Sequence, residues 1–389
     1  MNVPRGLRVR PSASLLSATL WLVMASLSAK AQTFTIVHSF GAPNDGAYPS
    51  GPLLRDLMDN LYGASQGGGS FGWGTVFKID PSNKERVLYS FRDGADGLIP
   101  SISFLQSGTI VGTTYQGGVN LFGTVFKLNP EGNLTNLFSC CNPTEIGVSP
   151  GGVIQDVDGN LYVVAFSGGD FSCSLTGCGT IFKLSGPSTA TLVHTFGGEG
   201  GDGQNPNGSL LRDAAGNLYG TTLYGGTSGY GTIFKIVPGD IETVLYSFEG
   251  SGDGSFPYSG VYRDPQGNLY GTTASGGSHN FGTVFKVTSS GEHLVLYDFN
   301  GSDGDQPTGG AILDPSGNIY GVTYLGGRHN KGTVFKLNPN GDLTVLHDFS
   351  GANDGAYPES VLPMNGTLYG VTYQGGTYNL GVLFRLVPD

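Results

Sequence analysis

The stretch GNLYGTTLYGGTSGYGTIFKI, Gly216–Ile236, mixes dense glycine with short apolar segments and ends in a strand-like run. Its core recurs along the chain as GTVFK or GTIFK and, in a last copy, as GVLFR. The first glycines of these cores are Gly74, Gly123, Gly179, Gly231, Gly282, Gly332 and Gly381, which gives spacings of 49 to 56 residues. Recurrence at about fifty residues is typical of a tandem-repeat architecture.

Each repeat unit contains four strand-like pieces separated by turn residues, as in GSLLRD, NLYGTT, GTIFKI and TVLYSF of the fourth unit. In GTVFKL the side chains of Thr, Phe and Leu alternate with those of Val and Lys, as expected for a strand. Four antiparallel strands in a unit of 40 to 50 residues describe a propeller blade. A β-solenoid is the alternative, but its coils usually take about 20 to 30 residues. We predict an all-β, seven-bladed β-propeller.

The order GNLYGTT, GG, GTVFKL, LYSF, DG and proline resembles the GloVer tandem repeat, the Gloeobacter/Verrucomicrobia type of exported bacterial proteins. The resemblance covers all seven units. It implies a signal peptide, and it implies no catalytic residues because the family has no established biochemical role.

The two ends of the chain complement each other. Residues 33–40, TFTIVHSF, match the fourth strand of the other units, but no first three strands precede them. The C-terminal GVLFRLVPD is a third strand without a fourth. Because an unpaired edge strand invites aggregation, we expect residues 33–40 to become the outermost strand of the last blade and to close the ring.

The first residues differ from the repeats. Arg5, Arg8 and Arg10 precede the apolar run LLSATLWLVMASLSA, which Ala29-Lys30-Ala31 follows. This order is typical of a secretory signal, and the run is shorter than the ~20 residues of a membrane anchor, the alternative. We expect a signal peptide over residues 1–31 and one propeller over residues 32–389. The protein would be secreted, periplasmic or held at the cell surface, with no membrane span after cleavage.

The net charge of the mature chain argues against two kinds of partner, nucleic acid and anionic membrane. The signal holds four of the 19 basic residues and none of the 30 acidic ones, so the mature chain has a net charge of −15. Such a surface repels nucleic acid and anionic membrane. We expect a monomer whose partners are glycans or extracellular proteins.

Comparison between units separates structural positions from candidate binding positions. The loops between the second and third strands place Asn280, Asn330 and Asn379 where other units have glycine, so these asparagines are expected to form turns. One fourth-strand position carries His or Tyr in six units and Phe138 in the other, which argues against proton transfer there. The third-strand lysines are expected to pair with the aspartates of the DG turns, which we interpret as turn formers rather than metal ligands. Ile146 replaces that aspartate in unit three.

Aromatic residues at the end of the second strand are the candidate binding residues: Tyr115, Phe166, Tyr224, Tyr324 and Tyr373. Packing between blades is the equally weighted alternative for these rings. His279 and His329 lie in equivalent loops one blade apart and could cluster with Arg328, although exposed loop positions explain them as well.

All four cysteines, Cys140, Cys141, Cys173 and Cys178, fall in unit three. Export permits disulfides. We expect the bridges to stay within this region, either joining its two loops or closing Cys173 to Cys178 locally.

Two functions fit these observations. Aromatic rings on a rigid face suit recognition of a glycan or a protein, so a binding or scaffold module is favoured. The alternative is a carbohydrate-active enzyme, a polysaccharide lyase or hydrolase, with its site at the channel mouth, because propellers host both kinds of function. The repeats display no paired carboxylates, zinc-ligand spacing or nucleophile constellation, so the sequence nominates no catalytic residue, metal or cofactor.

The signal assignment predicts that the exported protein begins at Gln32. N-terminal sequencing of secreted material should give QTFTIV, because cleavage after Ala31 removes the small-x-small site. Secreted protein that still begins at Met1 would contradict the assignment.

Overall fold

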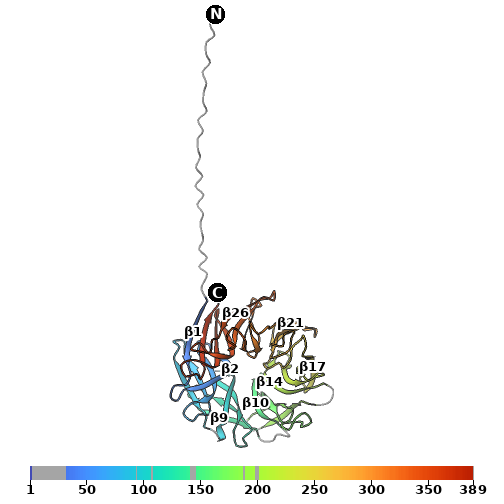
Figure 1. Cartoon of the computed structure of the whole chain (residues 1–389). Coiled ribbons are helices and arrows are strands. Elements are labelled where there is room, and N and C mark those ends of the chain that lie inside the picture. The colour runs from blue at the N-terminus through green and yellow to red at the C-terminus, as the bar shows by residue number, and fades with distance from the viewer. Residues whose placement is uncertain are drawn as a thin grey trace. The chain divides into compact units, whose positions relative to one another are not determined.

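The computed structural model describes residue 1 and residues 32–92, 94–106, 108–140, 146–186, 189–197 and 201–388. The predicted signal peptide lies outside the described residues, apart from Met1. Residues 32–388 form one compact unit. Within it the strands form seven antiparallel sheets, and the fold is the predicted seven-bladed β-propeller (Figure 1).

The first three blades follow the repeat units in chain order. Blade 1 contains β2 (Gly46–Arg55), β3 (Leu61–Gly68), β4 (Thr75–Ile79) and β5 (Glu85–Ser90). A short 3-10 helix, η1 (Gly94–Asp96), precedes blade 2, which contains β6 (Leu98–Gln106), β7 (Thr109–Gln116), β8 (Thr124–Leu128) and β9 (Leu134–Ser139). Blade 3 contains β10 (Val148–Gln155), β11 (Leu161–Ser167), β12 (Thr180–Leu184) and β13 (Ala190–Thr195).

The next three blades repeat this order, with broken inner strands in two of them. Blade 4 contains β14 (Gly203–Arg212), β15 (Leu218–Gly225), β16 (Thr232–Val237) and β17 (Ile241–Ser247). Blade 5 contains β18 (Tyr262–Arg263), β19 (Leu269–Thr273), β20 (Thr283–Val287) and β21 (His293–Asp298). Blade 6 contains β22 (Asp305–Pro307), β23 (Ile312–Leu313), β24 (Ile319–Leu325), β25 (Thr333–Leu337) and β26 (Leu343–Asp348), and both β22 and β23 pair with β24.

Blade 7 is shared between the two ends of the chain, as predicted. It contains β27 (Ala356–Met364), β28 (Thr367–Gln374), β29 (Val382–Val387) and, outermost, β1 (Thr33–Ser39). β1 runs antiparallel to β29, with Thr33 opposite Val387 and Ser39 opposite Val382. Figure 1 shows the blue strand β1 beside the red C-terminal strands. The pairing covers the free edge of β29 and closes the ring.

Neighbouring blades meet through one contact that recurs seven times. The first glycine of each GTVFK-like core has φ between 92° and 104°, and a Cβ added there would lie 2.3–2.7 Å from Cδ of a proline in the next blade's inner strand. The residue before that proline donates its amide to the carbonyl of the residue before the glycine, with N···O distances of 2.6–3.4 Å. Gly381 and Pro49 make the same contact between blades 7 and 1. Only glycine allows this approach, which explains its recurrence.

Phenylalanine fills the space between blades. Phe77 on β4, and its equivalents Phe126, Phe182, Phe234, Phe285, Phe335 and Phe384, have no exposed surface. A Cβ at Gly220 would lie 2.5 Å from Cζ of Phe234, so the glycine of the NLYG motif makes room for this ring. Burial of such side chains is the main favourable term in the stability of the ring.

The loop asparagines are turn formers, as predicted. Asn280, Asn330 and Asn379 have φ of 63°, 52° and 57°, and each side-chain oxygen accepts an amide of its own loop. In unit two Leu121 holds the equivalent position, two residues before Gly123, and is also left-handed, with φ of 67°.

The predicted pairing of third-strand lysines with the DG aspartates is wrong. Lys78 Nζ lies 5.5 Å from the centroid of the Tyr62 ring, and four other blades repeat this contact. The aspartates instead bind the fourth-strand His or Tyr, as Tyr89 Oη donates to Asp96 Oδ2 at 2.6 Å. In unit three both partners are apolar, Phe138 and Ile146, and both pack on the same core.

The contact between blades predicts a difference between two neighbouring glycines. Gly231→Ala should destabilise the protein by about 3 kcal/mol, because backbone strain of ~1–2 kcal/mol adds to a clash with Pro257. Gly229→Ala is the control, since Gly229 also has positive φ but nothing lies within 4 Å of an added Cβ, so only about 1 kcal/mol is expected. Denaturant unfolding measures both, and equal losses would show that the contact does not hold the blades together.

Candidate functional site

The inner strands carry different side chains in different blades beside the proline of the blade contact. One such position is the residue that directly follows this proline. Its occupants are Ser50, Ser101, Gly151, Asn207, Tyr258, Thr308 and Glu359. We call these seven residues the variable ring. A site with specific chemistry needs a set of residues that the repeats do not share, and the variable ring is such a set.

Backbone geometry brings the variable ring to the central channel. The residue before each proline is left-handed, with φ between 54° and 60° in all seven blades, even where that residue is Ile99 or Tyr357. Left-handed conformations cost free energy for residues other than glycine, so the fold imposes them. The chain then turns into a cavity of about 570 Å³ lined by inner strands of all seven blades and by six of the seven variable-ring residues.

Glu359 is the one charged side chain among the described residues that line this cavity. It comes from β27 and remains partly exposed to the channel. Desolvation by the channel wall raises the pKa of its carboxyl from 4.5 to about 7. Near neutral pH this carboxyl therefore both donates and accepts hydrogen bonds, depending on its protonation.

Tyrosine rings lie around Glu359. Tyr258 belongs to the variable ring and is 49% exposed. Burial raises the pKa of Tyr258, Tyr324 and Tyr373, and the Glu359 carboxylate raises each further. These phenols remain protonated at neutral pH and keep their hydroxyl donors. Tyr324 and Tyr373, two of the predicted aromatic residues, therefore lie close enough to Glu359 for its charge to raise their pKa.

The predicted aromatic residues also contact the next blade. Tyr324 stacks on Tyr357 and Tyr373 on Tyr48, both with ring centroids 5.0 Å apart, whereas Tyr224 meets Phe256 edge to face at 5.5 Å. In each pair the partner is the left-handed residue before the proline. Packing between blades therefore orients these rings.

The remaining predicted rings differ in position and exposure. Tyr115 is 39% exposed and Tyr224 is 43% exposed. Tyr115 and Tyr373 directly follow Thr114 and Thr372, the second-strand residues that pair with the prolines of their blades. In blade 4 the residue that pairs with the proline is Thr222, so Tyr224 lies one position later and pairs with Gln204. Phe166 is partly buried, and its carbonyl accepts the side-chain amide of Asn205 at 2.9 Å.

The structure places the predicted loop cluster in two separate blades. His279 Nδ1 lies 3.8 Å from Asp298, and Arg328 Nε lies 3.7 Å from Asp348. Each residue pairs with the fourth strand of its own blade, and His329 is exposed. No hydrogen bond or ion pair among the described residues joins His279, Arg328 and His329.

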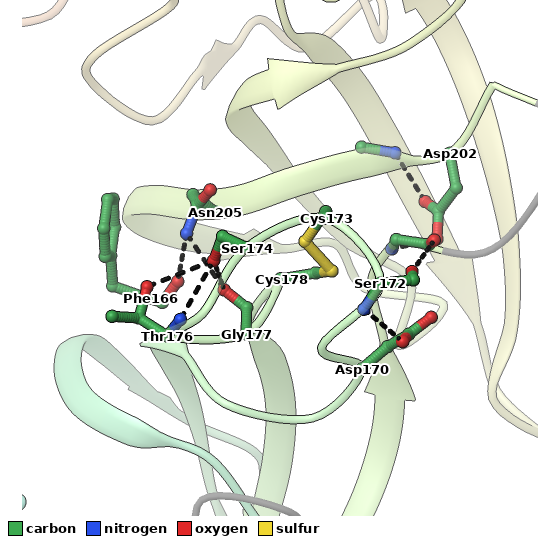
Figure 2. The surroundings of a disulfide bond; sticks show 12 residues. Phe166, Asp170, Ser172, Cys173, Ser174, Thr176, Gly177, Cys178, Asp202 and Asn205 are labelled. Atoms are coloured by element: carbon green, nitrogen blue, oxygen red, sulfur yellow. Dashed lines mark hydrogen bonds between the residues drawn. A yellow bond between two sulfur atoms is a disulfide. The ribbon is translucent and has the colours of Figure 1, made fainter.

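Unit three contains a disulfide between Cys173 and Cys178, the local alternative of the two predicted (Figure 2). Ser174 Oγ donates to the Gly177 carbonyl and Ser172 Oγ to the Gly197 carbonyl, so the loop is tied to itself and to the next segment. Asn205 in Figure 2 donates from the next blade to the Phe166 and Gly177 carbonyls. Cys140 is buried in the core and Cys141 lies outside the described residues.

Sequence reasoning missed Glu359, Tyr258 and the rest of the variable ring. Part of the signal was present, since the residue after the proline changes from unit to unit while the proline recurs, but the residue before the proline changes as much. Recognising it required knowing that the left-handed residue before proline turns the chain into the channel.

The repeat pattern and the fold define a class of tandem-repeat β-propellers. The Gloeobacter/Verrucomicrobia repeat matches residues 23–212, 101–314 and 149–384, so the chain belongs to this family. No curated protein matches the sequence.

Several solved structures are similar in fold. The extracellular domain assigned to a hybrid two-component system of B. thetaiotaomicron has a TM-score of 0.57 at 15% identity, and the match covers 92% of this chain and 41% of that one. A second B. thetaiotaomicron extracellular domain, from a one-component system, has a TM-score of 0.56 at 11% identity, with 90% and 39% covered. A Xanthomonas campestris gluconolactonase has a TM-score of 0.48 at 13% identity, with 98% and 100% covered. Among the described residues, no helix is long and apolar enough to cross a membrane.

The raised pKa of Glu359 predicts how Glu359→Gln changes stability with pH. A carboxyl with a pKa of about 7 in the fold and 4.5 in the unfolded chain stabilises the fold below pH 4.5, and the contribution is lost as pH rises through 7. Glu359→Gln should therefore unfold at a higher temperature than wild type at pH 8 and at a similar temperature at pH 4.5. A lower unfolding temperature at both values would show that burial does not penalise this carboxylate.

Proposed function

We propose that the protein is an exported binding module whose channel mouth recognises a neutral glycan. The observation that carries the proposal is the variable ring, which gathers non-repeated residues of six blades around one cavity. Export rests on the predicted signal over residues 1–31, and the ligand rests on the chemistry of the ring.

A sugar ring needs an apolar surface and several directional hydrogen bonds, and this site offers both. Tyr258 presents an exposed ring and a protonated hydroxyl. Asn207 donates to the Tyr258 carbonyl at 2.9 Å, which leaves its side-chain oxygen as an acceptor. Together with Glu359 these groups fit the alternating apolar faces and hydroxyls of a pyranose.

The charge of the residues that line the cavity restricts the class of ligand. The described lining residues include no Lys, Arg or His, so a uronate, sulfate or phosphate would find no counter-charge there. The mature chain is also strongly acidic. A neutral glycan is therefore favoured over an acidic polysaccharide, and over the extracellular protein that the sequence also allowed.

A hydrolase is the second candidate because a glutamic acid with a pKa of about 7 suits general acid catalysis. Glycosidases, however, use two carboxyl groups, about 5–5.5 Å apart in retaining enzymes and about 6.5–9.5 Å in inverting ones. Glu359 has no second carboxylate among the described lining residues. Polysaccharide lyases act on uronates, which this site does not favour. Binding without turnover is the better-supported interpretation.

The proposal predicts which substitutions abolish glycan recognition. Tyr258→Ala and Glu359→Gln should each weaken a glycan found by array screening at least about tenfold by calorimetry, about 1.4 kcal/mol. Tyr378→Ala is the matched control, because Tyr378 is similarly exposed at 52% but is not among the lining residues.

Three outcomes would contradict the proposal. One is an array without any neutral glycan bound, and another is equal loss of binding in Tyr378→Ala. The third is release of reducing sugar by wild type but not by Glu359→Gln, which would assign the enzyme alternative instead.

A further inference from the structure

Two of the seven boundaries between blades contain the same three ionisable residues. At the boundary of blades 7 and 1 they are His38, Asp45 and Glu85, and at that of blades 3 and 4 they are His194, Asp202 and Glu242. In each case the histidine comes from a fourth strand, the aspartate from the DG turn, and the glutamate from the start of the next blade's fourth strand. We call these sets boundary triads. They are separate from the channel.

The triads bring three potential metal ligands together. One donor atom from each residue lies within 4.8 Å of the other two. His38 Nε2 is 2.9 Å from Asp45 Oδ2, and His194 Nε2 is 3.5 Å from Asp202 Oδ2. The side chains are largely shielded from solvent, with Asp45 5% and Asp202 14% exposed.

Each triad contains a buried polar atom that the protein does not satisfy. Oε1 of Glu85 and Oε1 of Glu242 are buried and have no hydrogen-bond partner among the described residues. Burial, and then the neighbouring Asp45 or Asp202, raises the pKa of each glutamate from 4.5 to about 7. Two carboxylates close together in a partly buried site, one with an unpaired oxygen, are costly unless a cation joins them.

We propose that each boundary triad binds one divalent transition-metal ion of the zinc class, so that the chain binds two. One imidazole nitrogen and two carboxylate oxygens form a donor set that suits Zn²⁺, whereas Ca²⁺ takes oxygen ligands alone. Ligands at about 2.0–2.2 Å from a tetrahedral Zn²⁺ lie about 3.3 Å from one another, so His38 and Asp45 would separate slightly from 2.9 Å on binding, whereas His194 and Asp202, 3.5 Å apart, already fit. The ion joins two blades, and at blades 7 and 1 it joins them where the ring closes.

The other boundaries act as internal comparisons. Where the glutamate is absent, its place is taken by Leu134, Ala190, His293, Leu343 or Phe34. His347 and Asp354 are 3.3 Å apart like the triad pairs, but Phe34 stacks on the histidine at 3.7 Å in place of a third ligand. At blades 2 and 3 all three positions are apolar, namely Phe138, Ile146 and Ala190. Histidine, aspartate and glutamate occur together at only these two boundaries among the described residues.

Metal stoichiometry tests the proposal. Protein purified without a histidine tag and stripped with chelator should bind two equivalents of Zn²⁺ in calorimetry and metal analysis. Glu85→Gln and Glu242→Gln should each retain one equivalent, and the double variant none. His347→Gln is the matched control and should retain two, because that boundary lacks the third ligand. Circular dichroism confirms that each variant is folded.

Thermal unfolding supplies a second readout that a merely structural role would not give. After chelator treatment, saturating Zn²⁺ should raise the unfolding temperature of wild type and leave that of the double variant unchanged, since only wild type gains the binding free energy. Wild type that binds no Zn²⁺, binds Ca²⁺ instead, or loses no equivalent on either glutamate substitution would overturn the proposal.

Discussion

The contact of a glycine in one blade with a proline in the next determines most of this structure. It requires φ near 100° at the glycine, a left-handed residue before the proline, and an amide-to-carbonyl hydrogen bond between the blades. No other residue fits at the glycine, and the proline cannot donate a hydrogen bond, so its neighbour supplies the donor. The same contact between Gly381 and Pro49 holds the two ends of the chain in register.

This contact also explains how a uniform scaffold acquires a specific site. The glycine, the left-handed backbone and the proline recur in every blade, and in six of the seven blades the next residue lines the channel cavity. That position is where Asn207, Tyr258 and Glu359 differ from their equivalents. The boundary triads lie at a second place where the blades differ, between the fourth strands of neighbouring blades. There His, Asp and Glu occur together at two boundaries, and other residues replace one or more of them at the rest of the described boundaries. The repeats therefore keep the contacts that hold blades together and vary the residues beside them.

Much of the fold was predictable because it depends on periodicity. The spacing of the GTVFK cores predicted seven blades, and the incomplete units at the two ends predicted that β1 pairs with β29. The left-handed loop asparagines followed from glycine in the equivalent units. The lysines were assigned wrongly because charge suggested a carboxylate partner, whereas Lys78 lies over the Tyr62 ring. The DG aspartates, which were the expected partners of these lysines, pair instead with fourth-strand residues, as Asp45 does with His38.

The candidate site was less predictable for a physical reason. Comparing units identifies residues that the fold demands, but a binding residue is one that the fold does not demand, so the comparison passes over it. Glu359 stands in a unit otherwise like the others, and its environment depends on six other blades. Tyr324 and Tyr373 were found because aromatic residues at a strand end are conspicuous in sequence. Their closeness to Glu359 could be recognised only once the blades were arranged in a ring.

Hydrogen exchange at the amides before the seven prolines tests the central claim most directly. These are the amides of Tyr48, Ile99, Ser149, Asn205, Phe256, Gln306 and Tyr357, each bonded to the preceding blade. If the glycine–proline contact holds the blades and closes the ring, all seven should exchange slowly and at comparable rates, Tyr48 included. Exchange of Tyr48 orders of magnitude faster than the other six would show that the ring is open between blades 7 and 1. Fast exchange at all seven would show that this contact does not hold the propeller together.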